Sequence, residues 1–220
     1  MSDAVVSQLT GPVLEPENGQ PESMVILCHG YGSNGNDLIQ LAPQWQAILP
    51  GTVFLSPDAP EDCPGAPGGY QWFPLTTMSK EERKAGVYKA APVLDAFIDQ
   101  SLEKYGLSEN RLALVGFSQG TMMGLHVGPR RKKQLAGILG FSGALAAPEN
   151  LIAEMKSKPP VALFHGNQDS TVPFPAMFEA AGALEAAGVE VQRHLSQGIA
   201  HSIAPEGLQK GGTFLATIFG

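Results

Sequence analysis

Cysteine and charged residues are scarce in this sequence, and long apolar runs are absent. Two of the 220 residues are cysteines, Cys28 and Cys63, and they form neither a CxxC pair nor a metal-ligand spacing. No apolar stretch approaches the roughly 20 residues that span a bilayer. The first residues, MSDAVVSQLTG, lack the basic and apolar regions of a secretory signal. We therefore expect a cytoplasmic protein without stable membrane anchoring, in which a disulfide between the two cysteines is not implied.

Positive charge is also in short supply. Lys and Arg number 14 against 21 Asp and Glu, which gives a formal net charge of -7. A negative protein repels nucleic-acid phosphate and anionic membrane surfaces, so neither is an expected partner. The one basic run, residues 130–133, follows a predicted helix, where cations suit the negative end of the helix dipole. We interpret this run as a solvated helix end.

Apolar residues, by contrast, make up 43% of the chain and are arranged in short runs separated by longer amphipathic stretches. Nearly continuous apolar runs are typical of strands buried on both faces of a parallel sheet. The alternation of strands and helices predicts one doubly wound α/β domain over residues 1–220, with a mostly parallel sheet. The expected strands span 24–28, 52–56, 111–117, 135–141, 160–166 and, at an edge, 189–195. The expected helices span 36–49, 80–105, 119–131, 148–156, 174–187 and 205–219.

Three further features of the fold follow from local signals. Residues 4–14 are expected to add a short antiparallel edge strand. In the longest helix, Ser79 is the expected N-cap with Glu82 three residues later, and Pro92 should kink or divide the helix. Segment 57–78, rich in Gly and Pro, is the longest predicted loop, and loops of this length are usually functional.

The strongest signal for function is the pentapeptide GFSQG at residues 116–120. It directly follows the apolar run RLALV and precedes the helix-like stretch TMMGLHV. A serine on such a sharp strand-to-helix turn has a strained backbone, and small flanking residues let the turn close. Its Oγ then projects above the sheet edge, at a helix N-terminus that stabilises developing negative charge. The motif therefore predicts that Ser118 is a catalytic nucleophile.

A second serine, Ser142, also ends an apolar run, in the sequence GFSGA. The fifth residue of this pentapeptide is Ala144, Pro148 comes soon after, and no helix is expected to begin at the serine. Because a nucleophile turn of this kind requires a helix at that point, we interpret Ser142 as a turn residue.

A serine hydroxyl needs a base to take its proton, and on this kind of scaffold the histidine base comes after the serine along the chain. Of the five histidines, His201 lies in the loop after the last strand and before the last helix, where such a base belongs. His29 precedes the serine, His126 falls on the following helix, and His194 lies within a strand. His165 ends a strand and is interpreted as structural.

Asp169 is the expected acid that orients the histidine. It lies in the turn GNQDSTVP at the carboxyl end of a strand, the edge at which ligands bind in open α/β sheets. Glu179 and Glu185 lie on the following helix and are interpreted as solvated. Asp also suits a turn for local hydrogen-bonding reasons, and the two roles are compatible. Acyl transfer by these groups requires neither a metal nor an organic cofactor.

Acyl transfer places negative charge on the former carbonyl oxygen, which two preorganised backbone N–H groups should receive. One expected donor is Gln119, the residue after the nucleophile. The other should come from the glycine-rich loop HGYGSNGND after strand 24–28, with Tyr31 as the candidate and Gly30 or Gly32 as alternatives. This loop lacks the glycine spacing of a dinucleotide-binding fingerprint.

Five motifs in order, CHGYGSNGND, QWF, GFSQG, HGNQDSTVP and AHSIAPEGL, resemble the phospholipase/carboxylesterase family, which includes bacterial carboxylesterases and the acyl-protein thioesterases. The resemblance runs from about Val25 to the C-terminus. It implies an α/β-hydrolase fold without a large lid domain, a triad at Ser118, Asp169 and His201, and an oxyanion hole at the two backbone positions named above. Family substrates are carboxylic esters and thioesters with acyl chains, including lysophospholipids and S-acylated proteins.

The resemblance also places Trp72 and Phe73 near the acyl site, and Leu75, Met78 and Val172 are expected to contribute to the same wall. Taken alone, aromatics on a glycine-rich loop fit a core plug equally well. We favour a substrate wall, because pockets for apolar ligands are lined by such side chains. The loop form PGGYQWFPL resembles the bacterial carboxylesterases more than the eukaryotic thioesterases.

The sequence thus predicts a serine carboxylesterase that hydrolyses small-molecule acyl esters through an acyl-enzyme. Lysophospholipase or acyl-protein thioesterase activity at the same site is the alternative. A non-catalytic binding protein of the same fold is a rival interpretation, which the intact triad positions disfavour. The acyl chain length and the alcohol portion are left open, and exposed apolar residues near 57–78 would allow a homodimer that nothing specifies.

Overall fold

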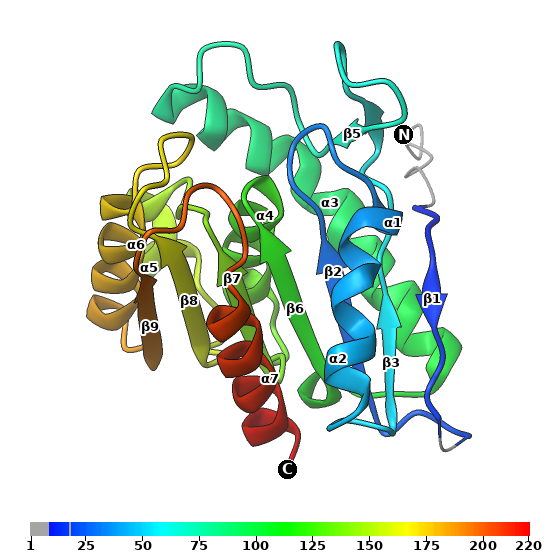
Figure 1. Ribbon diagram of the computed structural model, residues 1–220. Helices are drawn as coiled ribbons and strands as arrows, with labels where there is room; N and C mark the ends of the chain where they lie inside the picture. Colours follow the sequence, from blue (N-terminus) through cyan, green and yellow to red (C-terminus); the bar gives the residue numbers. More distant parts are fainter. Residues whose placement is uncertain (1–8, 18) are drawn as a thin grey trace, which may run out of the picture.

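The fold is built around one large, mostly parallel sheet, so the carboxyl ends of its parallel strands lie along the same edge (Figure 1). The structure, a computed structural model, describes residues 9–17 and 19–220. Within these residues, seven strands form the sheet in the order β1-β3-β2-β6-β7-β8-β9, parallel throughout except for β1 against β3. The strands are β1 (Val13–Leu14), β2 (Ser23–Cys28), β3 (Thr52–Leu55), β6 (Leu112–Phe117), β7 (Gly137–Phe141), β8 (Val161–Gly166) and β9 (Val191–Ser196). The predicted mostly parallel, doubly wound sheet is confirmed.

The two edges of the sheet match the expectations for its end strands. The last strand, β9, lies at one edge and is partly exposed along its length. At the other edge, β1 pairs antiparallel with β3, with Val13 opposite Leu55. This confirms the end of the predicted N-terminal strand, whereas residues 4–8 of that prediction lie outside the described residues.

Helices cover both faces of the sheet. In Figure 1, α2 and α7 lie in front of it, and α3 and α4 lie behind it. The helices are α1 (Gly35–Leu38), α2 (Ala42–Gln46), α3 (Lys80–Tyr105), α4 (Gln119–Val127), α5 (Leu151–Glu154), α6 (Pro175–Ala186) and α7 (Pro205–Phe219). Short 3-10 turns occupy Ile39–Leu41, Glu109–Arg111, Gly128–Arg130 and Pro148–Asn150. Along the described ranges, no helix is both long enough and apolar enough to cross a bilayer.

The core consists of two apolar layers, one on each face of the sheet. Strand β2 shows how the chain builds both. Met24 and Ile26 belong to the layer that α3 and α4 cover, whereas Val25 and Leu27 belong to the layer that α2 and α7 cover. All four side chains are fully buried. Because both faces of β2 are covered, its sequence is a continuous apolar run and not an alternating one.

Prolines explain most differences between the predicted and observed helices. The expected helix 36–49 is divided into α1, a 3-10 turn and α2, which carries Pro43 in its first turn. A proline there starts a helix, because it has no N–H to donate to a preceding turn. Helix α4 ends at Val127, and Pro129 enters a 3-10 turn. Helix α3, in contrast, runs through Pro92 undivided, so of the two expected outcomes, a kink or a division, the division is wrong.

The start of α3 is capped as predicted, and it also fixes the segment before it. The Ser79 Oγ accepts the N–H of Glu82 at 3.1 Å. The Glu82 carboxylate in turn accepts the N–H groups of Thr76, Thr77 and Met78 at 2.6, 2.8 and 2.8 Å. These hydrogen bonds lower the pKa of Glu82 to about 2, and the bond from Thr76 contributes most. The chain between the long loop and α3 is therefore tied down by one carboxylate.

The long loop at 57–78 contains a small hairpin that is attached to the end of β2. Its strands β4 (Glu61–Asp62) and β5 (Tyr70–Gln71) pair antiparallel. Tyr70 then bonds to the loop after β2: Tyr70 N–H donates to Ser33 O at 2.7 Å, and Gly32 N–H donates to Tyr70 O at 2.9 Å. The predicted loop is thus an ordered element that braces the carboxyl edge of the sheet.

Candidate active site

Ser118 lies on the turn between β6 and α4. Its backbone angles, φ 54° and ψ -112°, are rarely adopted by residues with a side chain, and its N–H donates to Phe141 O at 2.9 Å. A Cβ on Gly120 would stand 1.8 Å from the carbonyl oxygen of Cys28, and one on Gly116 would stand 2.4 Å from the backbone of Gly120. Only glycine fits at both positions, so the GFSQG pattern lets this turn close against the end of β2.

The side chains of His201 and Asp169 meet Ser118 from two other loops. His201 Nε2 lies 3.0 Å from Ser118 Oγ, and His201 Nδ1 lies 2.7 Å from Asp169 Oδ2. His201 follows β9, and Asp169 follows β8. Because a carboxylate only accepts hydrogen bonds, the Nδ1 proton points to Asp169, and Nε2 is left to accept the Ser118 hydroxyl proton. The fold thereby joins residues 83 and 32 positions apart into one hydrogen-bonded row.

The Asp169 carboxylate is buried and fully engaged. Its Oδ1 accepts the N–H groups of Thr171 and Val172, both at 2.9 Å. Its Oδ2 accepts from His201 and also lies 3.1 Å from His165 Nε2. Burying a charged group without partners is costly, and the three donors Thr171, Val172 and His201 satisfy the carboxylate and fix its direction toward His201.

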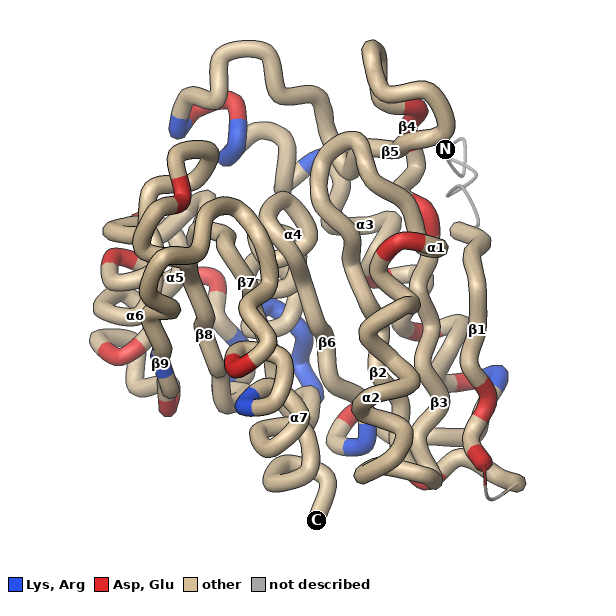
Figure 2. The backbone as a smooth tube through the Cα atoms, viewed as in Figure 1, with Lys and Arg blue, Asp and Glu red and all other residues tan. Residues whose placement is uncertain are grey.

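The loops around Ser118 carry almost no charge (Figure 2). Five segments contain or directly follow strand ends at this end of the sheet, namely 29–35, 116–122, 141–147, 164–174 and 197–204. Asp169 is the one Asp, Glu, Lys or Arg within them. Asp169 is therefore the charged side chain that these five segments place beside His201. Within residues 9–17 and 19–220, no group of three His, Cys, Asp or Glu side chains is placed to hold a metal ion.

The loop after β2 packs directly against the serine turn. A Cβ on Gly30 would stand 3.3 Å from Ser118 Cβ, so the backbone of this loop is in contact with the serine. Neither the N–H of Tyr31 nor that of Gln119 donates a hydrogen bond to another described residue. Two free backbone donors, one from each loop, therefore flank Ser118.

The aromatic side chains that are expected to line the substrate site are buried in the core instead. Trp72 is 1% exposed, Phe73 0% and Val172 1%. Side chains without accessible surface form no substrate wall, so the expectation is corrected for these three, and the core-plug interpretation fits the two aromatics. Leu75 is half-buried and Met78 is exposed, so both keep surface that a ligand could touch.

Two histidines to which the sequence assigns no catalytic role contact the site from behind. His165 Nε2 lies 2.7 Å from Val172 O as well as beside Asp169. His29 is fully buried: its Nε2 accepts the N–H of Ala59 at 2.9 Å, and its Nδ1 lies 2.8 Å from Gly30 O. Burial lowers the pKa of His29, so the ring is neutral. The i,i+4 spacing to Asp169 was an available signal for His165, whereas no local pattern indicates the contacts of His29.

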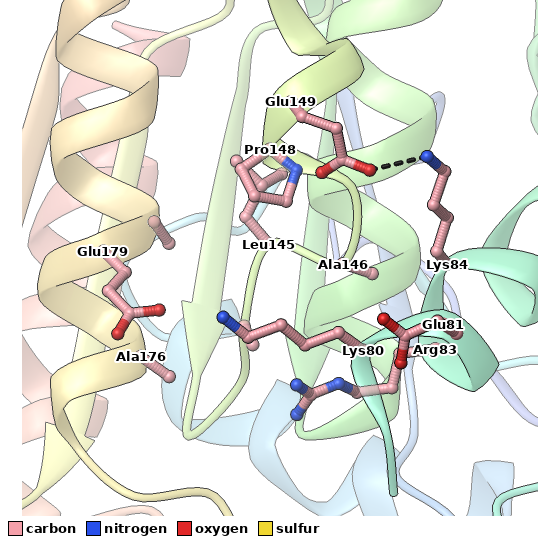
Figure 3. A pocket seen from close by; sticks show the side chains of 12 residues that line it. Lys80, Glu81, Arg83, Lys84, Leu145, Ala146, Pro148, Glu149, Ala176 and Glu179 are labelled. Carbon is pink, nitrogen blue, oxygen red and sulfur yellow. Dashed lines mark hydrogen bonds and ion pairs between the residues drawn. The ribbon is translucent and has the colours of Figure 1, made fainter.

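A cavity of about 380 Å³ opens beside the serine turn, between α3, α6 and the segment after β7 (Figure 3). Ala144 lines this cavity and directly follows Gly143, on which a Cβ would stand 2.9 Å from Ser118 O. Gly143 therefore links the cavity lining to the turn, although neither Ser118 nor His201 lines the cavity itself. The apolar part of its lining consists of Ala144, Leu145, Ala146, Pro148, Ala176 and Ala180.

Charged side chains surround that apolar part. In Figure 3, Lys80 and Arg83 extend from the start of α3 into the space that faces Glu179 on α6. Lys84 and Glu149 form an ion pair of 2.6 Å across the rim. A molecule in this cavity would meet methyl groups on one side and charges of both signs around it.

Comparisons with known proteins agree with this geometry. A family model described as Phospholipase/Carboxylesterase matches residues 9–219. The crystal structure of esterase PE8 is 44% identical, with a TM-score of 0.94, and covers 96% of this chain and 100% of that one. Acyl-protein thioesterase 1 of Gibberella zeae is 27% identical over 93% of this chain and 94% of its own length. Esterase YpfH of Escherichia coli K12 is 24% identical over 90% of this chain and 83% of its own length.

The family match covers nearly all of the chain, and the sheet, the helices on both faces and the serine turn are those of an α/β-hydrolase. No large lid domain interrupts the described residues. The protein therefore belongs to the phospholipase/carboxylesterase family, which confirms the resemblance of its motifs and the prediction of a carboxylic ester hydrolase.

Proposed function

We propose that this protein is a serine carboxylesterase with Ser118 as nucleophile, His201 as general base and Asp169 as the acid that orients the histidine. The observation that carries the proposal is the row of two hydrogen bonds, 3.0 Å from Ser118 to His201 and 2.7 Å from His201 to Asp169. The chain order of serine, acid and histidine is that of α/β-hydrolases. Membership of the family supports the same assignment.

The reaction would proceed in two halves. His201 Nε2 takes the Ser118 proton while Oγ attacks the ester carbonyl carbon, and the same proton then passes to the oxygen of the departing alcohol. This half leaves an acyl-enzyme. Water next attacks the acyl carbon and gives a proton to His201, which returns it to Ser118 Oγ as the carboxylic acid is released. Asp169 stabilises the imidazolium that forms in each half.

Tyr31 and Gln119 would supply the oxyanion hole through their backbone N–H groups. Two observations support this role: both donors are free of other described partners, and the loop of Tyr31 contacts Ser118 through Gly30. Gln119 is also the first residue of α4, so the helix dipole adds to its N–H. Preorganised donors of this kind are usually the largest single contribution to acyl-transfer catalysis.

We further propose that the cavity between α3, α6 and the segment after β7 receives part of the substrate, and that its charged rim favours small or polar substrates over long acyl chains. Lys80, Arg83 and Glu179 surround its apolar part. A long acyl chain would displace water from these charged groups and offer them no hydrogen bonds in return, which is energetically costly. A short acyl or alcohol group would instead contact the apolar part and leave these charges hydrated. Leu75, half-buried within the long loop, and the exposed Met78 are the remaining candidates for an apolar substrate contact.

Hydrolysis of acyl-protein thioesters or lysophospholipids at the same site is the second candidate. Three relatives named acyl-protein thioesterase 1 match 93–98% of the chain at 25–28% identity, which favours it. The 44% identity to an esterase favours the carboxylesterase.

A hydrolysis panel separates these functions. It comprises p-nitrophenyl esters from acetate to palmitate, an acyl thioester and a lysophospholipid, with Ser118→Ala as the blank. We expect the highest kcat/KM for the short esters, a decline with chain length, and a burst of p-nitrophenol that reports the acyl-enzyme. A maximum for the thioester or the lysophospholipid would assign the second candidate, and activity in the blank would refute the mechanism.

The two cysteines bear on where the protein works. Cys28 and Cys63 are both free and buried. Burial raises the pKa of Cys28 to about 12, which makes it an inert core thiol. Free thiols are typical of reducing compartments, and this supports a cytoplasmic location.

A further inference from the structure

The two proposed oxyanion donors come from separate loops, and a third segment bridges them. Tyr31 follows β2, and Gln119 follows β6. Between the loops lies Trp72, directly after β5 in the long loop. Its side chain is 1% exposed and offers almost no surface to a ligand, so we look for its role in the contacts that its polar atoms make.

Trp72 is bonded to both donor loops. Its indole Nε1–H donates to the carbonyl oxygen of His29 at 3.0 Å, two residues before Tyr31. Its backbone N–H donates to Gln119 Oε1 at 2.8 Å. The Gln119 amide completes the link, because its Nε2 donates to Phe73 O at 2.7 Å. One side chain amide and one indole thus join β5, the loop after β2 and the first residue of α4.

His29 makes the link rigid on the Tyr31 side. Because the N–H of Ala59 can only donate, His29 Nε2 is the acceptor and the ring proton is on Nδ1, where it donates to Gly30 O. The carbonyl groups of His29 and Gly30 are therefore both held, one by Trp72 and one by the ring itself. The N–H of Tyr31 belongs to the same peptide group as the carbonyl of Gly30, so the ring of His29 fixes the plane of that peptide.

We propose that Trp72 is a positioning residue for the oxyanion hole, which it fixes by holding the loop of Tyr31 and the side chain of Gln119 at a set separation. The inference rests on the proposed serine mechanism. Displacing a catalytic group by about 1 Å can cost about 100-fold in rate, so a link between the two donors matters even though it never meets the substrate. The bond that carries the proposal is the indole N–H to His29 O at 3.0 Å.

The chain offers a matched control in its second tryptophan. Trp45 is also buried, at 2% exposed, and its Nε1–H also donates to a backbone carbonyl at 3.0 Å, that of Leu208. This contact joins α2 to α7, on the front face of the sheet in Figure 1, and touches none of the loops around Ser118. Each variant therefore removes one buried indole donor: Trp72→Phe removes it near the site, and Trp45→Phe removes it away from the site.

The test compares the two variants by kcat, KM and the inhibition constant of a short alkyl trifluoromethyl ketone. Ser118 Oγ adds to the ketone carbon, its proton passes to His201, and the ketone oxygen becomes an oxyanion in the proposed hole. For Trp72→Phe we expect kcat to fall about 10-fold to 100-fold and the inhibition constant to rise by a similar factor, with KM within about threefold. For Trp45→Phe we expect neither kcat nor the inhibition constant to move by more than about twofold, at a comparable loss of thermal stability.

Equal kinetic losses in the two variants, or a fall in kcat without weaker ketone binding, would overturn the inference. Gln119→Met supplies a second test if Trp72→Phe does not fold, because it removes both hydrogen bonds of the side-chain amide and keeps the backbone N–H. We expect the same changes in kcat, KM and the inhibition constant. Ser118→Ala runs in parallel: full activity in that variant would refute the proposed function itself, a result that the tryptophan variants cannot mimic.

Discussion

Two serine turns stand side by side at the carboxyl edge of the sheet, on the neighbouring strands β6 and β7. Ser118 and Ser142 each come after Gly-Phe, and both have a positive φ, 54° and 47°. Each N–H donates to a phenylalanine carbonyl at the end of the next strand, Phe141 or Phe164, at 2.9 Å. Both side chains are buried. In backbone terms the two turns are nearly equivalent.

The two turns differ in the element that comes next along the chain and in the side chain that approaches the serine. Helix α4 begins directly after Ser118, whereas the chain after Ser142 forms no helix before the 3-10 turn at Pro148–Asn150. Ser118 Oγ meets His201, while Ser142 Oγ has no hydrogen-bond partner among the described residues. A strained serine turn is thus a feature of how these strands end, and the helix terminus and the histidine are the features that distinguish the catalytic candidate.

The largest effect expected from this comparison is on activity. Ser118→Ala should lower kcat by about 10⁴-fold to 10⁶-fold, because the nucleophile is lost, with little change in the free energy of unfolding. Ester hydrolysis and a urea melt measure the two quantities.

Ser142→Ala is the matched control. It should retain activity within about threefold, and its free energy of unfolding should stay equal or rise by up to about 1 kcal/mol, because the removed hydroxyl is buried without a partner. A large loss of kcat in this variant, comparable to that of Ser118→Ala, would erase the distinction between the turns.

Asp169→Asn removes the charge that orients the histidine and leaves both turns in place. An amide can satisfy Thr171 and Val172 through its oxygen, but its NH₂ group then faces His201 and favours the wrong tautomer. We expect kcat to fall about 10³-fold to 10⁴-fold with KM little changed, measured on a short p-nitrophenyl ester. Wild-type kcat in this variant would show that Asp169 is a turn former and no more.

A smaller effect, on stability, concerns the fifth residue of the two pentapeptides GFSQG and GFSGA, which is Gly120 in the first and Ala144 in the second. Gly120→Ala places a Cβ 1.8 Å from Cys28 O, so the backbone must move, and we expect a loss of about 3 kcal/mol or more in the free energy of unfolding. The reciprocal change, Ala144→Gly, should cost about 1 kcal/mol. Urea melts of both variants test the contrast, which equal losses would contradict.

The smallest effect on activity is expected from the pH dependence of stability conferred by α4, the helix that only the Ser118 turn possesses. Burial, with a smaller contribution from Arg130, lowers the pKa of His126 on this helix from 6.5 to about 4. The unfolded chain therefore binds the proton more readily. Stability is fully present above about pH 6.5 and declines toward pH 4, by at most about 1.4 kcal/mol per pH unit for this residue. His126→Phe should flatten that part of the unfolding curve, and an unchanged slope would assign the acid sensitivity elsewhere.

Much of this distinction is accessible from the sequence. Continuous apolar runs predict the five parallel strands from β2 to β8, because strands covered on both faces leave no polar alternation, and β9 is predicted as an edge strand. The glycine at position 120 and the helix-like residues after it separate Ser118 from Ser142. The Ser79 cap also follows from local spacing.

The remaining features depend on contacts between distant segments. The prediction of a substrate wall is wrong for Trp72 because composition cannot tell a buried aromatic on a loop from an exposed one; its partner His29 lies 43 residues away. The support of Asp169 by His165 likewise needs the turn after β8 to close. Pro92 stays within α3 even though proline usually interrupts a helix.

Covalent labelling with a fluorophosphonate, followed by digestion and peptide mass mapping, tests the central claim most directly. The reagent reacts with a serine that a neighbouring base activates. We predict one adduct per chain, on Ser118, in step with the loss of esterase activity, absent in Ser118→Ala and unchanged in Ser142→Ala. An adduct on Ser142, or full hydrolysis in protein completely labelled at Ser118, would contradict the assignment of Ser118 as the nucleophile.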